Sequence, residues 1–333
     1  MLLKPIQPHD MEGRGHWIGA SSFETRSVAG PRRLPTELRL EAATVVNYTT
    51  PLRQTSREAL AKNRGRLLAS LRAMGVEPRE RDVFAFRMGS LRHALDEVAR
   101  SADLRSPSWI VVDISCLTKI HAVALAEWLS EMLPLASESR IAIQYSNPAS
   151  YGWGESSRRA DQHFSEMLYA PLGRRVRRSD DGEELEALVI LGHEGARLQY
   201  ALASFHFVGG LRVTTRTAGP SDFEFRAKMF NRQFLSDSRS GILGVWDKLT
   251  VEQADTRLLA EEVTSYLARP GRSTQSRTVI FPLGPKSTTI QAVLTAIAIP
   301  EVDLWVGYPV PATYSSDYSA GVGETTIWEC VLE

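Results

Sequence analysis

The chain has 333 residues, of which 43% are hydrophobic and 23% charged, and this composition excludes an intrinsically disordered protein. Its length suits two domains of about 150 residues each. Lys plus Arg and Asp plus Glu number 39 each, and this balance argues against a dedicated nucleic-acid-binding protein. The balance does not exclude a local basic patch.

Cysteine usage and hydropathy indicate a cytoplasmic protein. Cys116 and Cys330 lie far apart, which excludes a disulfide scaffold and a thiolate zinc site. Residues 1–17 carry no apolar segment like that of a secretory signal, and no segment approaches the ~20 apolar residues of a membrane span. The spacing of His, Asp and Glu matches no zinc site, so we predict no metal. We also predict no membrane contact, and no cofactor other than a possible nucleotide ligand.

Strands and helices alternate through the first half of the chain. Residues 1–15 mix Pro, Gly and charge and are expected to form a flexible lead-in to a first unit over residues 16–170. Its expected strands are 16–21, 42–49, 83–86, 109–114 and 141–145. Its expected helices are 57–74, 91–102 and the segment after Lys119 through Leu133.

The second half repeats this order after residues 171–186, where the composition turns basic, then acidic, and predicts a linker. The second unit covers residues 187–333. Its expected strands are 188–191, 211–215, 241–246, 278–281, 302–306 and a final edge strand over 326–332. Its first expected helix begins within residues 192–197. The other expected helices cover 222–235, 251–267 and the segment that follows residues 283–288 and ends at Ile299. The alternation predicts an α/β protein of two tandem Rossmann-like units with mostly parallel sheets.

Matching residues at the ends of the strands favour an internal duplication. Glu24 and Glu194, which each follow a first strand, are 170 positions apart. Lys119 and Lys286, which each follow a fourth strand, are 167 positions apart. Tyr151 and Tyr314, each in a Pro-Ala-Ser/Thr-Tyr segment after a last strand, are 163 positions apart. The alternative is two unrelated Rossmann-like domains with coincidental turns.

The candidate ligand-binding residues lie where parallel strands end, because open α/β sheets bind ligands outside those ends. In residues 281–289, a strand leads through Gly284 to Lys286, Ser287 and Thr288 at a helix start, which suits an anion. The segment is not a P-loop, since the first glycine of that motif is missing and Pro285 precedes the lysine. The alternative is a helix that Pro285 simply starts. Ser115 and Lys119 form a similar, weaker candidate in the first half.

Acidic and aromatic residues supply the other candidates. Glu24 with Arg26, and Glu194 with Arg197, could accept ribose hydroxyls or supply a general base, or could merely cap helices. His193 could act as an acid or base, and Asp113 could face a ligand or serve a turn. Tyr314 lies in a tail rich in Tyr, Ser and Gly that could stack on a base.

Two short signatures carry a resemblance to a known group of proteins. Residues 22–27 (Ser-Phe-Glu-Thr-Arg-Ser) and 284–286 (Gly-Pro-Lys) resemble those of a bacterial family of uncharacterised proteins, itself similar to components of antiphage defence neighbourhoods. The duplicated layout is also similar to Rossmann-like nucleotide sensors of CRISPR accessory proteins. The resemblance implies a role in a defence complex with a protein partner, and it identifies no catalytic residue.

Three functions stay open at this point. The first is a module that binds or senses a nucleotide-like or phosphorylated ligand, with phosphates at Lys286 and Lys119. The second is a nucleotide-processing enzyme, such as a glycosidic-bond hydrolase using Glu24 or Glu194. The third is a scaffold subunit of a larger complex.

Overall fold

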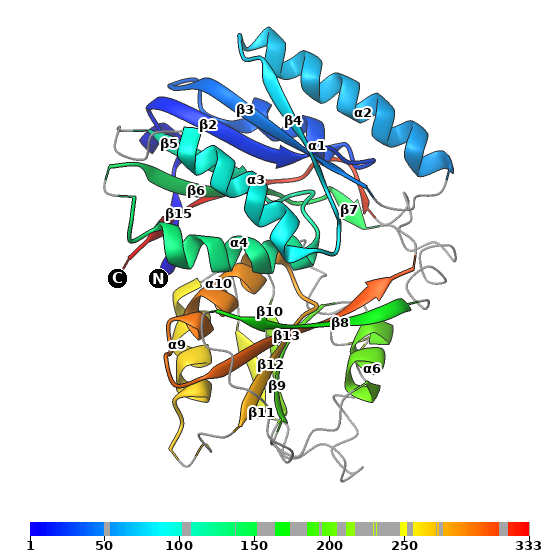
Figure 1. The fold of residues 1–333 in the computed structure, drawn as a ribbon, viewed down its shortest axis with the longest axis vertical. Helices are drawn as coiled ribbons and strands as arrows, with labels where there is room; N and C mark the ends of the chain where they lie inside the picture. Colours follow the sequence, from blue (N-terminus) through cyan, green and yellow to red (C-terminus); the bar gives the residue numbers. More distant parts are fainter. Residues whose placement is uncertain are drawn as a thin grey trace. The chain divides into compact units, whose positions relative to one another are not determined.

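The structure is a computed structural model of the full chain. The residues that it describes are 1–49, 54–101, 108–136, 138–151, 164–173, 185–192, 195–204, 211–216, 229, 231, 247–251, 256–270, 272, 276–312 and 319–332. The chain divides into two compact units. Unit 1 comprises Met1–Ala160 and Thr313–Glu333, and unit 2 comprises Asp161–Ala312. Each unit holds one mostly parallel sheet and several helices, which confirms the predicted α/β fold class (Figure 1).

The sheet of unit 1 has seven strands in the order β1-β15-β6-β5-β2-β3-β4, of which β2 to β6 are parallel. β15 is antiparallel to both of its neighbours, β6 and β1. The strands are β1 (Leu2–Ile6), β2 (Gly13–Ala20), β3 (Leu38–Tyr48), β4 (Pro78–Val83), β5 (Trp109–Asp113), β6 (Arg140–Ser146) and β15 (Thr325–Val331). The order β4-β3-β2-β5-β6 is the doubly wound one, and its topological switch point lies between β2 and β5.

In the described part of unit 1, four α-helices connect the parallel strands. They are α1 (Arg26–Ala29), α2 (Gln54–Ala73), α3 (Met88–Ser101) and α4 (Lys119–Met132). α1 packs with α2, and α3 packs with α4. The two pairs lie on opposite faces of the sheet, as right-handed crossovers in a sheet of this order would place them (Figure 1). β5 is buried along its whole length, and its Val111 shares a hydrophobic cluster with Trp17 of β2 and Leu67 of α2.

Unit 2 repeats the strand order of unit 1. Its sheet reads β11-β10-β9-β12-β13-β8, in which β8 is antiparallel and the other strands are parallel. The strands are β8 (Phe164–Leu172), β9 (Leu185–Leu191), β10 (Leu211–Arg216), β11 (Asp247–Val251), β12 (Arg277–Pro282) and β13 (Asp303–Pro311). The helices described are α6 (Gly195–Ala203), α9 (Thr256–Leu267) and α10 (Lys286–Ile297). The switch point of this sheet lies between β9 and β12.

The antiparallel strands beside β6 and β13 are exchanged between the two halves of the chain. β8 follows β6 along the chain but pairs with β13, whereas β15 follows β13 but pairs with β6. The short strands that precede them, β7 (Ser150–Tyr151) and β14 (Ser319–Ala320), pair with each other. This reciprocal connectivity and the shared strand order are what a duplicated chain would give. The duplication itself stays a prediction.

The exchange moves the predicted unit boundaries. The end of the chain, predicted in the second unit over 187–333, belongs to unit 1, because β15 hydrogen-bonds to β6 and β1. Residues 164–170, predicted in the first unit, belong to β8 of unit 2. Of the predicted linker 171–186, the first two residues end β8 and the last two begin β9, while 174–184 lie outside the described residues.

Three local predictions also change. The lead-in over residues 1–15 contains β1 and the start of β2, because β1 pairs with β15 along its whole length. The strand predicted at 83–86 is β4 and ends at Val83, where its pairing with β3 stops. The helix predicted from residue 251 begins at Thr256, since Val251 still pairs with β10. Most of the predicted elements 222–235 and 241–246 lie outside the described residues.

Among the helices described, none is long and apolar enough to cross a membrane.

Candidate functional site

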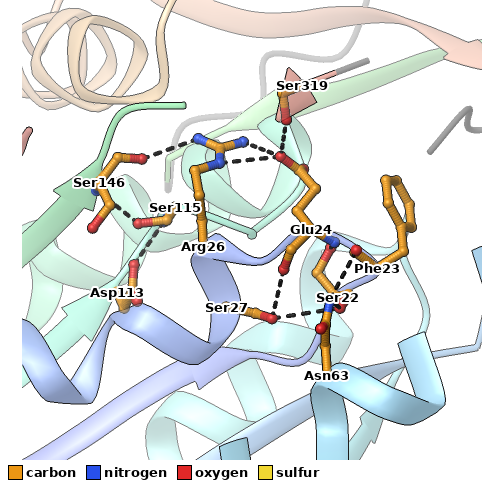
Figure 2. A network of polar contacts seen from close by, with 10 residues as sticks. All are labelled: Ser22, Phe23, Glu24, Arg26, Ser27, Asn63, Asp113, Ser115, Ser146 and Ser319. Carbon is orange, nitrogen blue, oxygen red and sulfur yellow. Dashed lines mark hydrogen bonds and ion pairs between the residues drawn. The ribbon is translucent and has the colours of Figure 1, made fainter. Parts of the chain in front are cut away.

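The carboxyl ends of β2, β5 and β6 hold a connected polar network at the switch point of unit 1 (Figure 2). Its centre is an ion pair between Glu24 and Arg26, in the turn from β2 to α1. The Arg26 Nε donates to Glu24 Oε2 at 3.1 Å, Nη2 donates to the same oxygen, and Nη1 donates to the Ser146 carbonyl at 3.0 Å. The side chain of Arg26 is 4% exposed and that of Glu24 is 14% exposed. The guanidinium therefore joins the ends of β2 and β6.

Arg26 stays charged in this buried position. Burial alone would lower the pKa of the guanidinium, but the Glu24 carboxylate outweighs it and raises that pKa well above its ordinary value. A second group also binds Glu24, because the Ser319 hydroxyl of β14 donates to Oε2. Oε2 of Glu24 thus accepts hydrogen bonds from both Arg26 and Ser319.

Hydrogen bonds from α2 hold the turn that carries this ion pair. Asn63 of α2 donates through Nδ2 to the carbonyls of Phe23, at 2.8 Å, and Ser22, at 3.2 Å. The Ser27 hydroxyl donates to the Glu24 carbonyl at 2.8 Å, and the Glu24 amide donates to the Ser22 hydroxyl at 3.2 Å. These hydrogen bonds hold the backbone of residues 22–27 in place.

Asp113 and Ser115 connect the ends of β5 and β6. The Ser115 amide donates to Asp113 Oδ1 at 2.8 Å, and the Ser115 hydroxyl accepts from the Ser146 amide at 2.8 Å. Both side chains are buried. Gly30 lies against this carboxylate, since a Cβ built on it would be 1.9 Å from Asp113 Oδ2. These contacts fill the switch point with the protein's own groups.

The start of α4, where Lys119 is the first residue, is capped from within the protein. The Thr118 hydroxyl accepts from the His121 amide at 3.2 Å, and the Thr118 amide donates to the Tyr48 hydroxyl at 3.2 Å. His121 Nε2 lies 3.2 Å from the Arg87 carbonyl, so this nitrogen carries the proton and Nδ1 accepts from the Tyr48 hydroxyl at 2.9 Å. Burial lowers the pKa of His121 to about 4. The imidazole is therefore neutral at pH 7.

At the second switch point, the backbone after β12 lies directly against the end of β9. A Cβ built on Gly192 would be 2.0 Å from the Leu283 carbonyl oxygen, and one built on Gly284 would be 2.9 Å from the Leu191 carbonyl oxygen. Pro285, whose ring carries no hydrogen-bonding group, occupies the N-cap position of α10. The first helical hydrogen bond runs from the Thr289 amide to the Pro285 carbonyl at 3.0 Å.

The first turn of α10 buries its hydroxyl side chains. Ser287 is 1% exposed and Thr289 is fully buried, and neither hydroxyl has a hydrogen-bond partner within the described part of the chain. Thr288 is also buried, whereas Lys286 is partly exposed. Because Cα–Cβ bonds tilt toward the N-terminus of a helix, the Ser287 side chain leans toward the start of α10. A buried hydroxyl without a partner costs roughly 1–3 kcal/mol and needs an explanation.

Arg197 of α6 lies against β13. Its Nη1 donates to the Tyr308 hydroxyl, and its guanidinium carbon lies 5.6 Å from the centre of the Tyr308 ring. His193, Glu194 and Tyr314 lie outside the described residues.

The structure thus brings the candidates together in two groups. Those in unit 1 are Glu24, Arg26, Asp113 and Ser115, and those in unit 2 are Gly284, Lys286, Ser287 and Thr288. Ser146, Asn63 and Ser319 join the first group without having been predicted. Ser146 directly follows the predicted strand 141–145 and could have been included for that reason. Ser319 lies 295 positions from Glu24, and no local pattern relates the two. No group of three or more His, Cys, Asp or Glu residues with metal-binding geometry occurs among the residues that the structure describes.

Comparison with known proteins adds no family. No protein-family model matches the chain, and no curated protein matches it either.

Proposed function

We propose that the protein binds a phosphorylated, nucleotide-like ligand at the carboxyl edge of the second sheet, with a phosphate at the start of α10. The observation that carries the proposal is the unpartnered hydroxyl of Ser287, buried within the described part of unit 2 in the first turn of this helix. A phosphate oxygen would accept its proton and remove the cost of burying it.

The surroundings of Ser287 suit an anion. A helix N-terminus carries the equivalent of about half a positive charge, and α10 is twelve residues long. Lys286 adds a full charge at the first helical position. The site lies at the switch point between β9 and β12, where sheets of this order bind nucleotides.

The geometry of unit 1 gives the other hypotheses less support. Glu24 Oε2 receives Arg26 and Ser319, which favours an ion-pair role over that of a general base in a hydrolase. Thr118 caps α4, so a second phosphate at Lys119 would compete with the protein's own hydroxyl. A sensing role in a bacterial defence system, with a protein partner, rests on the sequence resemblance alone.

Binding to the purified protein tests the proposal. Isothermal titration calorimetry with AMP, ADP, ATP, a dinucleotide and inorganic phosphate should detect at least one ligand, and Lys286→Ala should weaken it. Lys119→Ala is the matched control, because Lys119 begins the corresponding helix, and it should leave the affinity unchanged. Equal losses in the two variants, or none in Lys286→Ala, would contradict the proposal.

A further inference from the structure

One flank of α2, in unit 1, carries positive side chains in a row. Lys62, Arg66 and Ser70 follow one another at intervals of four residues, which places them along one side of the helix. The buried Ser70 hydroxyl accepts a hydrogen bond from Arg32 Nε at 2.9 Å, so the 3₁₀ helix η2 (Pro31–Arg33) lies at the end of this line. Three exposed residues form what we call the cationic row: Arg32, Lys62 and Arg66.

Other positive charges of α2 are paired with acidic residues. On the side of the helix toward β4, Arg64 Nε lies 2.6 Å from Glu80 Oε2, and near the helix end Arg72 Nη2 lies 2.9 Å from Glu77 Oε1. Within the described part of the chain, the residues of the cationic row form no ion pair. Like charges four positions apart repel each other and weaken a helix. The cationic row therefore suits an external anion with several charges.

We infer that the cationic row binds the phosphate backbone of a nucleic acid, as a site separate from the one proposed at α10. The row from Lys62 to Ser70 is about 12 Å long, since a helix rises 1.5 Å per residue. One nucleic-acid strand carries a phosphate about every 3.4 Å of its axis, so about three phosphates fit this length. Two of the three cations are arginines, whose planar guanidinium groups pair with phosphate oxygens through two hydrogen bonds.

The composition of the row also determines what kind of binding to expect. Glu58, one turn before Lys62, ends the row on that side, so the contact is limited to a few phosphates. Contacts to phosphates position a protein on nucleic acid but read no bases. Binding is therefore weak, independent of base sequence and sensitive to salt, which agrees with the balanced charge of the whole chain.

An anionic membrane is the other polyanionic surface that could meet these cations. Helices that lie on membranes insert an apolar face between their basic residues. The apolar face of α2 is not available for insertion, because Leu67 and Leu71 are buried in the hydrophobic cluster of unit 1. The burial of these side chains favours nucleic acid over a membrane.

Fluorescence anisotropy of the full chain with a labelled duplex and a labelled single strand of mixed sequence tests the inference. Binding should be detected at about 50 mM salt and weaken toward 200 mM. The logarithm of the binding constant should fall against the logarithm of salt with a slope of about −3 for the duplex or about −2 for the single strand, as three phosphate contacts require. The form that binds more tightly identifies the preferred backbone.

Substitutions on the two sides of α2 assign the binding to the row. Arg66→Gln and Lys62→Gln, both at exposed positions, should each weaken binding of every sequence alike and reduce the steepness of the slope by about 1. Arg72→Gln is the matched control, because it removes the same charge from the same helix but from a residue paired with Glu77, and it should leave the slope unchanged.

Three results would overturn the inference. The first is no binding of either nucleic acid at about 50 mM salt. The second is an equal loss of affinity in Arg66→Gln and Arg72→Gln, which would indicate an effect of net charge alone. The third is binding to phosphatidylserine vesicles, weakened by Arg66→Gln, without binding to nucleic acid, which would assign the cationic row to a membrane surface.

Discussion

In both sheets a helix begins shortly after the fourth parallel strand, and in both the first helical residue is a lysine. α4 begins at Lys119 and α10 begins at Lys286. The residue before Lys119 is Thr118, whose hydroxyl accepts from the first turn of the helix at 3.2 Å. The residue before Lys286 is Pro285, which has no group to do so. The same position in the same strand order thus carries a side-chain cap in one unit and none in the other.

The neighbouring strand ends repeat the contrast. In unit 1 the Arg26 guanidinium joins the turn after β2 to the end of β6, and Asp113 and Ser115 connect β5 to β6. In unit 2 two glycines, Gly192 and Gly284, occupy the ends that face the switch point. A shared topology therefore fixes where a site could be, and the side chains at the strand ends decide whether it is filled from within.

Removal of Glu24 is expected to have the largest effect, because it leaves the Arg26 guanidinium buried without its partner. Glu24→Ala should lower the free energy of unfolding by about 3 kcal/mol, as breaking a buried ion pair does. Urea denaturation measures the loss, and hydrogen exchange should place it in β2, α1 and β6. Glu77→Ala, which removes an exposed ion pair with Arg72, is the control and should leave stability unchanged. A Glu24→Ala protein as stable as this control would show that the Glu24–Arg26 ion pair does not stabilise unit 1.

Acid should loosen unit 1 next. Burial lowers the pKa of His121 to about 4 from an ordinary 6.5, so between these values the unfolded chain takes up a proton that the folded protein refuses. The free energy of unfolding is therefore unaffected by this group above about pH 6.5. It falls by roughly 3 kcal/mol as the pH is lowered from 6.5 to 4. His16, whose pKa burial also lowers to about 4, should add a similar amount.

The variant His121→Gln isolates this contribution. Unfolding free energies measured between pH 7 and pH 4 should fall less steeply than in the unaltered protein. His93→Gln, at an exposed position on α3, should leave the pH profile as it was. If the unfolding free energy of His121→Gln fell with pH as steeply as that of the unaltered protein, His121 would not be a source of the pH dependence of unit 1.

Much of this fold could be predicted from sequence because buried parallel strands have a distinctive pattern. The continuous apolar segment at 109–114 is β5 to within one residue, since both faces of that strand are covered. β1 and β8 were not predicted as strands. β1 contains Lys4 and Pro5, and β8 is an exposed edge strand with little alternation, so neither carries a clear period.

The exchange of β8 and β15 between the two halves of the chain could not be predicted for a different reason. The segment 326–332 predicts an edge strand, but β15 lies inside the sheet between β1 and β6, and these partners are determined by contacts across more than 170 positions. The candidate site follows the same rule. Glu24 and Arg26 are two positions apart and were predicted together, whereas Ser319 meets Glu24 only because β14 pairs with β7.

A methyl group at the first switch point should have a moderate effect. Gly30→Ala would place a Cβ 1.9 Å from Asp113 Oδ2 and 3.2 Å from a ring carbon of Trp17, and such overpacking costs about 1–3 kcal/mol. Gly65→Ala is the matched control: a Cβ there has no heavy atom of the described residues within 4 Å, and it should stabilise α2 by about 0.5–1 kcal/mol. Thermal unfolding should therefore shift in opposite directions for the two variants. A Gly30→Ala protein at least as stable as the unaltered one would mean that the switch point of unit 1 has room to spare.

The helix starts themselves give the smallest effect and the most direct comparison. Thr118→Ala should cost about 1 kcal/mol, because it removes the cap of α4. Pro285→Ser places a hydroxyl at the N-cap of α10, whose ψ of 150° already suits a cap, and its gain is offset by the lost rigidity of proline. Stability should change by less than about 1 kcal/mol, yet a phosphate ligand should bind more weakly, since the new hydroxyl competes for the first-turn amides. Unchanged affinity in Pro285→Ser would mean that the ligand does not bind at the start of α10. The N-caps of α4 and α10 would then differ without any difference in ligand binding between the two helix starts.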